Sequence, residues 1–144
     1  MENEKQLEHI KKHLNCSFIQ TKTIALTSDW EPIGGFSENG LFSGKFLATG
    51  GAMITDITIS HKGSGDIHAG FFATVSEGSH IEGLKLVYKA VDIENTSVER
   101  SGDLYFGGIA GEHVSPRTID NCTVTLGSIR LVNQNGDVYC GGIA

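Results

Sequence analysis

Three aspartates recur at matching points of the sequence, and their spacing is the first feature that could support chemistry. Each follows a glycine in a repeated nine-residue phrase, and the three are Asp66, Asp103 and Asp137. If the phrases stack about 4.8 Å apart, the carboxylates repel one another, and calcium would relieve that repulsion through its preference for oxygen ligands. Alternatively, each aspartate caps a glycine turn through its own backbone. The unequal intervals of 37 and 34 residues favour the capping role.

Two other sets of residues could react or bind a metal, but each is incomplete. His9 and His13 have the spacing of a zinc-binding helix, yet the residues between them supply no base and no third ligand is evident. Asp92, Glu94 and Arg100 are the nearest approach to the groups of a polysaccharide-cleaving site, and a loop of solvated charges explains them better. We therefore expect no catalytic residues, no metal and no cofactor.

One tryptophan and three cysteines complete the residues with distinctive chemistry. Trp30 lies between two acidic residues and could stack on a sugar ring. Cys122 and Cys140 occupy apolar repeat positions and are expected to be small buried side chains, while Cys16 has no partner in view. An odd count without a spacing signature predicts neither a zinc site nor a disulfide framework.

The elements that carry these residues are predicted by the repeats. The glycine-aspartate phrase occupies residues 65–73, 102–110 and 136–144. A second phrase, with apolar residues at its first, fourth and sixth positions, occupies residues 54–59, 81–86 and 119–124. Repeats of this length are typical of one unit stacked on itself, and the alternation indicates short strands. Because no helical stripe follows residue 15 to connect parallel strands, we expect an all-β solenoid, a β-helix, over residues 16–144.

Residues 1–15 differ from the rest and are predicted to form an N-terminal capping helix. Leu7, Ile10 and Leu14 have helical spacing, with charged residues elsewhere in the segment. A solenoid end exposes strand edges, and a helix laid across it is a common remedy. The alternative is an amphipathic membrane anchor, which the narrow apolar face without aromatic residues disfavours.

Composition and charge exclude several classes of function. The chain has 144 residues, 19 glycines, two prolines and a net charge of −6, and its three arginines are well spread. Direct nucleic-acid binding needs clustered basic residues and is not expected. No apolar stretch is long enough to span a membrane, so no membrane insertion is expected.

The two ends of the sequence raise a question about the setting of the chain. No secretory signal is evident near the start, so the protein is expected to be cytoplasmic or to have had a leader removed. The sequence stops at Ala144, inside the third copy of the glycine-aspartate phrase. We therefore expect a part of a longer array, with further repeats or self-association at an uncapped C-terminal end.

A series of short motifs follows the order of a known family. They are DWEPIG at 29–34 after a strand at 18–26, LFSGKF at 41–46, MITDITI at 53–59, GFFA at 70–73, FGGIAG at 106–111, IDNCTV at 119–124 and CGGIA at 140–144. This order resembles the GLUG-motif repeat proteins of bacterial surfaces, with their W-x-P-I-G, F-x-G-x-F, I-x-x-L-x-I, GLFG, VGGLVG and I-x-N-C-x-V elements. The likeness covers nearly the whole chain after residue 6. One departure is LATGGA at 47–52, where the family has a D-G-N-G-H turn.

The resemblance implies a right-handed parallel β-helix in an extracellular or cell-surface protein, with Trp30 packed in the first coil. In that family the repeats are stalk or binding surface and carry no catalytic motif. Our leading hypothesis is therefore a non-catalytic repeat module, a stalk or an adhesive surface for protein or glycan. The alternatives are a polysaccharide-active β-helix enzyme and an acidic intracellular inhibitor that binds a charged partner.

Overall fold

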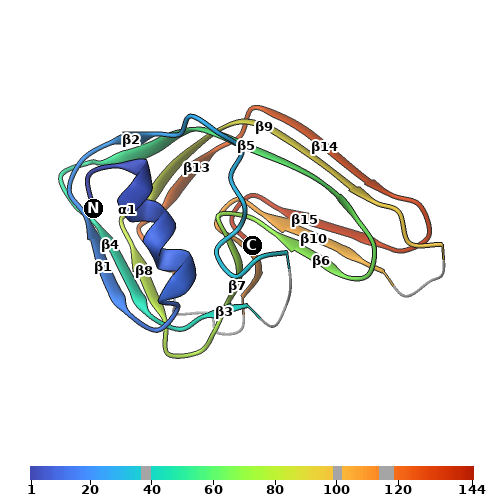
Figure 1. The fold of residues 1–144 in the computed structure, drawn as a ribbon, viewed down its shortest axis with the longest axis horizontal. Helices are drawn as coiled ribbons and strands as arrows, with labels where there is room; N and C mark the ends of the chain where they lie inside the picture. The colour runs from blue at the N-terminus through green and yellow to red at the C-terminus, as the bar shows by residue number, and fades with distance from the viewer. Residues whose placement is uncertain (37–39, 99–101, 114–118) are drawn as a thin grey trace.

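The computed structural model describes residues 1–36, 40–98, 102–113 and 119–144. The chain forms a β-solenoid of about three turns, built mostly from parallel strands and preceded by one short helix. In Figure 1 the turns are stacked along the line of sight with the helix in front, and the chain runs clockwise away from the viewer. The fold is therefore the right-handed parallel β-helix that the resemblance implied. In the described residues, no helix has the length and apolar character needed to cross a membrane.

Four sheets form the walls of the solenoid, and each is built from strands of successive turns. The first contains β1 (Ser17–Gln20), β4 (Lys45–Ala48), β8 (His80–Glu82) and β12 (Ile119–Asp120). The second contains β2 (Ile24–Ala25), β5 (Met53–Gly63), β9 (Lys85–Asn95), β13 (Thr123–Thr125) and β14 (Ser128–Asn133). The third contains β6 (Ile67–Ala69), β10 (Leu104–Gly107) and β15 (Val138–Gly141). The fourth contains β3 (Leu41–Phe42), β7 (Phe72–Val75) and β11 (Ala110–His113).

The three glycine-aspartate phrases lie side by side, as predicted. Ile67 of β6 pairs with Leu104 of β10, which pairs with Val138 of β15, and all these strands are parallel. Each phrase therefore occupies the same position in its own turn. The prediction of stacked turns is confirmed.

The second phrase is in register only for its last two copies. Ile119 pairs with Ile81, but the partner of Ile81 in the preceding turn is Phe46, and Ile54 pairs with Leu86 instead. The predicted equivalence of residues 54–59 with residues 81–86 is therefore wrong. The physical reason is the turn before the long strand: four residues separate β4 from β5, whereas two separate β8 from β9.

The N-terminal segment caps one end of the hydrophobic core. Helix α1 (Glu4–Glu8) continues as a 3-10 helix (His9–Lys12), and the Asn3 side chain accepts a hydrogen bond from the Gln6 amide as an N-cap. Leu7 and Ile10 are fully buried in the core, and Leu14 packs against it at its margin. The capping helix is therefore confirmed, although the helical part is shorter than the 1–15 that we predicted.

The first turn is narrower than the others, and this shapes the surface above β5. After β2 the chain does not follow β5 to its end but crosses toward β7. The Trp30 amide donates to the carbonyl of Thr58 at 2.7 Å, and the Ile33 amide donates to that of Phe71 at 2.9 Å. Figure 1 shows this crossing segment passing through the middle of the outline. The outer half of β5 is therefore left without a strand of the first turn beside it.

The last turn differs from the inner ones because no further turn covers it among the described residues. Leu104 and Ile109 are fully buried, whereas their equivalents Val138 and Ile143 are 42% and 38% exposed. Cys140 is also exposed and Cys122 is half-buried. The prediction that Cys140 is buried is wrong, because its inner equivalent, Phe106, is covered by the neighbouring turn and Cys140 is not.

The cap contributes directly to stability. We expect Leu7→Ala to lower the free energy of unfolding by about 2–4 kcal/mol, because the change leaves a cavity between the helix and the core. Lys12→Ala, at an exposed position of the same segment, should have little effect. Urea denaturation followed by circular dichroism measures both, and equal effects would contradict the capping role.

Candidate ligand-binding groove

The three predicted aspartates form a column, and hydrogen bonds join its members. The Asp103 amide donates to Oδ1 of Asp66 at 2.8 Å, and the Asp137 amide donates to Oδ1 of Asp103 at 2.9 Å. Each of the first two carboxylates thus caps the start of the strand in the next turn. The unequal intervals of 37 and 34 residues predict capping of the local turn in place of a stacked column. The structure differs on both points, because the three aspartates are stacked and the hydrogen bonds join successive turns.

An aromatic stack runs beside the aspartate column on the outer face of β6, β10 and β15. The His68 and Tyr105 rings lie 4.6 Å apart between centroids, and the Tyr105 and Tyr139 rings lie 4.9 Å apart and nearly parallel. Burial and the Asp103 carboxylate raise the pKa of Tyr105. The Asp137 carboxylate raises the pKa of Tyr139. Both phenols therefore stay protonated in a negative local potential.

Trp30 does not offer a ring face to a sugar. The side chain is 2% exposed, its ring stacks on Phe71 at 4.8 Å, and its Nε1–H donates to the Phe71 carbonyl. On the ring, Nζ of Lys11 lies 4.1 Å from the centroid, which is a cation–π contact. Trp30 therefore joins the cap to the core, in agreement with the packing role implied by the resemblance.

The other two sets of residues have structural partners or lie partly outside the described residues. Asp92 accepts a hydrogen bond from Arg130 at 2.9 Å in the next turn, while Glu94 lies 3.7 Å from Lys62. Arg100, the third member of that set, lies outside the described residues. The rings of His9 and His13 stack on each other. The described residues contain no group of three or more side chains that could hold a metal ion.

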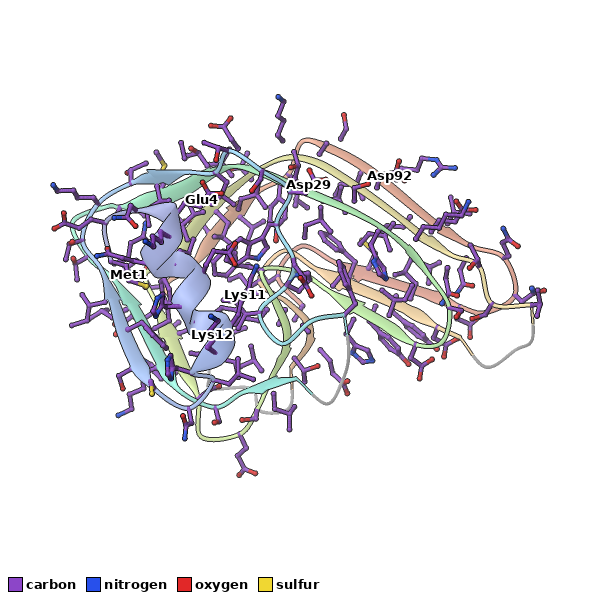
Figure 2. All side chains as sticks on the ribbon, in the orientation of Figure 1. Met1, Glu4, Lys11, Lys12, Asp29 and Asp92 are labelled. Atoms are coloured by element: carbon purple, nitrogen blue, oxygen red, sulfur yellow. The ribbon has the colours of Figure 1, made fainter. Side chains whose placement is uncertain are left out.

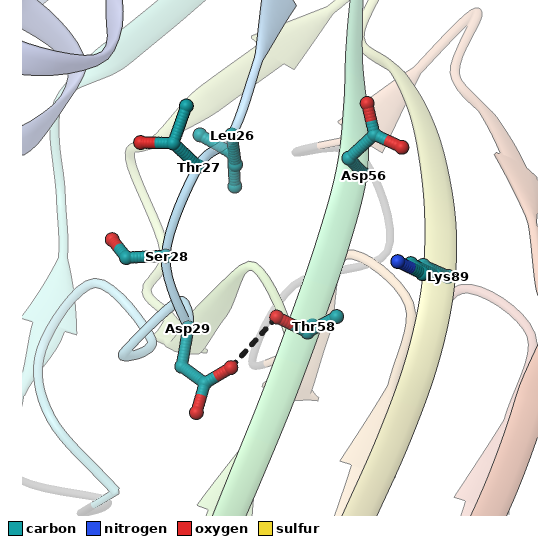
Figure 3. A pocket seen from close by; sticks show the side chains of 7 residues that line it. All are labelled: Leu26, Thr27, Ser28, Asp29, Asp56, Thr58 and Lys89. Atoms are coloured by element: carbon teal, nitrogen blue, oxygen red, sulfur yellow. Dashed lines mark hydrogen bonds between the residues drawn. The ribbon is translucent and has the colours of Figure 1, made fainter.

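A hollow lies on the outer face of the second sheet, beside the crossing segment (Figure 3). It has a volume of about 240 Å³. Its lining comes from three places, the segment after β2, strand β5 and strand β9: Leu26, Thr27, Ser28, Asp29, Asp56, Thr58 and Lys89. The Thr58 hydroxyl donates to Oδ1 of Asp29 at 2.8 Å and ties the segment to the sheet.

Two β-bulges place charged side chains in this hollow. The first bulge lies in β5, which has one residue more than β9 between the pairs Ile54–Leu86 and Ile57–Tyr88. The second bulge lies in β9, which has one residue more than β5 between the pairs Ile57–Tyr88 and Thr58–Ala90. The second extra residue is Lys89, which both pairs leave unpaired. In the first bulge, Asp56 has a φ of +57°, a left-handed conformation that aspartate tolerates better than most residues. Bulges often serve to redirect a side chain.

A second hollow adjoins the first and shares Asp29 with it. It has a volume of about 370 Å³ and is lined by Asp29, Trp30, Glu31, Phe36, Ser60 and His61. The Phe36 and His61 rings stack at 3.7 Å between centroids. Burial lowers the pKa of His61, against an opposing effect of the Glu31 carboxylate, so the imidazole is neutral near pH 7. We call the two hollows together the Asp29 groove.

The groove combines charged groups, hydroxyls and rings. Asp29, Asp56 and Lys89 make no ion pair with another described residue. One oxygen of Asp29 accepts from Thr58 and one of Asp56 accepts from Thr55, so the second oxygen of each carboxylate can accept from a ligand. Hydroxyl groups come from Thr27, Ser28, Thr58 and Ser60, and the rings of Phe36 and His61 lie at the other end. This arrangement suits a ligand that carries many hydroxyl groups and at least one apolar face.

Sequence analysis did not single out this groove, although one signal was present. Ile54 and Ile57 are both buried, although they lie three residues apart in the sequence. Tyr88 and Val91 are also both buried and also lie three residues apart. A spacing of three within a period-two pattern indicates an inserted residue. It therefore pointed to the two bulges, but not to the crossing segment that completes the groove.

A search against protein-family models, curated proteins and solved structures found no match to this chain. The resemblance to the GLUG-motif repeats therefore remains a prediction from the motifs. The fold is established by the structure alone.

The aspartate column provides one test of these contacts. We expect Asp103→Ala to lower the free energy of unfolding by about 1–2 kcal/mol, because the Asp137 amide loses its acceptor. Asp103→Asn retains an acceptor and removes charge repulsion, so it should be as stable as the wild type or more so. Urea denaturation measures both changes. Calcium that stabilises the wild type but not Asp103→Asn would instead indicate a cation site.

His61 provides a test through pH. Its pKa in the folded protein lies below the ordinary value of 6.5, so the unfolded state binds more protons in the acidic range and stability falls as pH drops below that value. His61→Phe retains a ring against Phe36 but cannot titrate. Between about pH 7 and pH 5 the variant should lose less stability than the wild type. Equal losses in chemical denaturation would contradict the assignment.

Proposed function

We propose that this protein is a non-catalytic β-solenoid binding module and that the Asp29 groove binds a glycan. The observation that carries the proposal is the pair of bulges in β5 and β9. Each adds one residue, and together they bring Asp56 and Lys89 into the hollow where Asp29 lies. A sheet that served only as a wall would have no need of two compensating insertions at one point.

The chemistry of the lining favours a glycan over a polypeptide. Carboxylates accept hydrogen bonds from sugar hydroxyls, Lys89 donates to ring and hydroxyl oxygens, and a pyranose face packs against an exposed ring. Phe36 is half-buried and lines the second hollow. An apolar peptide anchor would need an apolar pocket, whereas the hollow at Asp56 is lined mainly by polar side chains.

The charge of the groove selects among glycans. Asp29, Glu31 and Asp56 are acidic, and Lys89 is the one lysine or arginine among the described residues of the lining. A sulfated or carboxylated sugar would be repelled, while a neutral sugar or an amino sugar would not. We therefore expect neutral or amino-bearing oligosaccharides as ligands.

A binding role agrees with the setting that the sequence suggests. The resemblance to GLUG-motif repeats supports a stalk or adhesive module at a bacterial surface. The polysaccharide-cleaving alternative rested on Asp92, Glu94 and Arg100, and the two acidic members now have cross-strand or cross-turn partners. The inhibitor alternative has only the net negative charge in its favour.

The test is a glycan array of neutral, amino-bearing, sialylated and sulfated oligosaccharides, followed by calorimetry on the best binder. Asp29→Asn keeps an acceptor for Thr58 but removes the charge, and we expect it to weaken binding by about tenfold, the loss of one charge-assisted hydrogen bond. Phe36→Ala should weaken binding through the lost stacking surface.

Asp92→Asn is the matched control, because Asp92 lies on the outer face of the same sheet, outside the groove. It should leave glycan affinity unchanged. If the two asparagine variants behave alike, or if no glycan binds, the groove is not the site. Release of unsaturated products from acidic polysaccharides would favour the enzyme alternative.

A further inference from the structure

Part of strand β5 has a free backbone edge, and this edge lies in the Asp29 groove. The Thr58 carbonyl of β5 accepts from the Trp30 amide at 2.7 Å, and no described residue of the crossing segment after Trp30 makes a backbone hydrogen bond to β5. Beyond Thr58 the strand runs on to Gly63 and keeps its pairing with β9 on the other side. One side of β5 is therefore without a neighbouring strand from Ser60 onward, among the residues that the structure describes.

The backbone groups on this free side belong to Ser60 and Lys62. In a strand, the N–H and C=O of one residue point to the same side, and those of the next residue point to the other. The Gly63 carbonyl accepts from the Thr96 amide, directly after β9, whereas the Thr58 carbonyl faces the crossing segment. Because Ser60 and Lys62 alternate with Gly63 and not with Thr58, their backbone groups point away from β9. Within the described ranges, no hydrogen bond reaches these groups.

The free edge results from the path of the chain between β2 and β3, well inside the sequence. Figure 1 shows the crossing segment leaving the second sheet, while β5 continues beside β9. Asp92, the partner of Ser60 in the next turn, lies beyond Asp29 along this wall in Figure 2, on the part of the sheet that the crossing segment has left. Ser60 lines the second hollow together with Asp29 and Glu31. This hollow therefore has the edge of β5 as one wall and the crossing segment as the other.

A secondary amide matches these two walls. Its C=O and N–H point in opposite directions from a planar group. The oxygen can therefore accept from the Ser60 amide while the N–H donates to a carboxylate of the crossing segment, Asp29 or Glu31. Hydrogen bonds to a carboxylate are stronger than those between neutral groups. The stacked rings of Phe36 and His61, in the same lining, offer an apolar surface to a methyl group.

We propose that the second hollow binds the acetamido group of an N-acetylated amino sugar. The acetamido group is a secondary amide with a methyl group on its carbonyl carbon and the sugar ring on its nitrogen, so it meets both walls and the apolar surface at once. It carries no charge and is not repelled by the acidic lining. A free amino group would be attracted to the carboxylates but would offer no carbonyl to the Ser60 amide. This inference rests on the proposed glycan-binding function and narrows the ligand to one class of sugar.

The same edge is poorly suited to an added peptide strand. Strand addition gains its affinity from a series of main-chain hydrogen bonds, whereas two residues, Ser60 and Lys62, offer their groups before β5 ends at Gly63. Lysine at an edge is also one of the residues that discourage strand pairing, and the Lys62 side chain is 70% exposed here, with Glu94 as its partner. A single amide group therefore fits the edge better than a polypeptide.

Calorimetry with matched sugars tests the inference. Oligosaccharides of N-acetylglucosamine and of N-acetylgalactosamine are each compared with the glucose or galactose analogue, which has a hydroxyl group in place of the acetamido group, and with the free-amine analogue. We expect at least one N-acetylated sugar to bind about tenfold more tightly than both of its analogues, which is the effect of one or two further hydrogen bonds.

Two substitutions of Ser60 separate the backbone donor from the side chain. Ser60→Pro removes the N–H on the free side of β5, and proline is tolerated at an edge because this N–H takes no part in the ladder. It should abolish the preference for the N-acetylated sugar. Ser60→Ala removes the hydroxyl group but retains the N–H, so the preference should persist even where the overall affinity falls. Circular dichroism and the midpoint of urea denaturation show whether both variants are folded.

Hydrogen exchange followed by NMR gives a measurement on the wild type without any substitution. The Ser60 amide should exchange rapidly in the free protein and slowly when the N-acetylated sugar is bound, whereas the Thr96 amide, bonded to Gly63, should exchange slowly in both. If the hydroxyl analogues bind as tightly, or if Ser60→Pro keeps the preference, the inference is wrong and the glycan-binding function stands. If no sugar binds, or if an extended peptide alone protects the Ser60 amide, both are wrong.

Discussion

Hydrogen bonding between successive turns is the constraint on which the rest of this structure depends. Each strand pairs in parallel with the strand one turn away, so a residue in a regular strand has an equivalent in the neighbouring turn. This repetition turns single residues into columns: aspartate caps aspartate, and ring stacks on ring. An asparagine column follows the same rule, since Asn95 donates to the Gly65 carbonyl and the equivalent Asn133 donates to the Gly102 carbonyl. Aspartate and asparagine side chains, which in most folds would bond within their own turn, here form hydrogen bonds between successive turns of the solenoid. The columns are stabilising only while the register holds, so register and side-chain chemistry support each other.

The Asp29 groove, which we propose as a binding site, lies where that regularity is broken. Two compensating bulges restore the register after Thr58 and still leave Asp56 and Lys89 outside the pairing. The crossing segment leaves β5 near Thr58 and places Asp29 in the same hollow as Asp56 and Lys89. A perfectly regular wall would expose one repeating row of side chains per turn. A local departure instead places different residues from three segments in one hollow, and this heterogeneity is what selective recognition needs.

The sequence predicted the structural features that repeat from turn to turn, and it did not predict the groove, which occurs once. The glycine-aspartate phrase carries the solenoid, because identical residues in successive turns meet identical surroundings. Leu7 and Ile10 predicted the cap, since their helical spacing contrasts with everything that follows. The equivalence of Ile54 with Ile81 failed because a turn of four residues precedes β5 and a turn of two precedes β9. The groove was missed for a related reason. Asp29 and Asp56 line the same hollow because the crossing segment passes a bulged strand. Neither the crossing nor the bulge recurs at the repeat spacing, so the repeats did not predict them.

The N-terminal end of the solenoid shows how this architecture is closed. A β-helix has no intrinsic limit to its length, since each turn presents to the next the edge that it met itself. Closing an end therefore requires something that is not a turn, and here the first residues supply it: a helix over the core, with Lys11 resting on the Trp30 ring. The cap stops growth by replacing backbone donors and acceptors with apolar side chains and charges. The last turn keeps the backbone pattern of the inner turns and has few charges of its own. Among the described residues, the N-terminal segment alone replaces that edge with side chains.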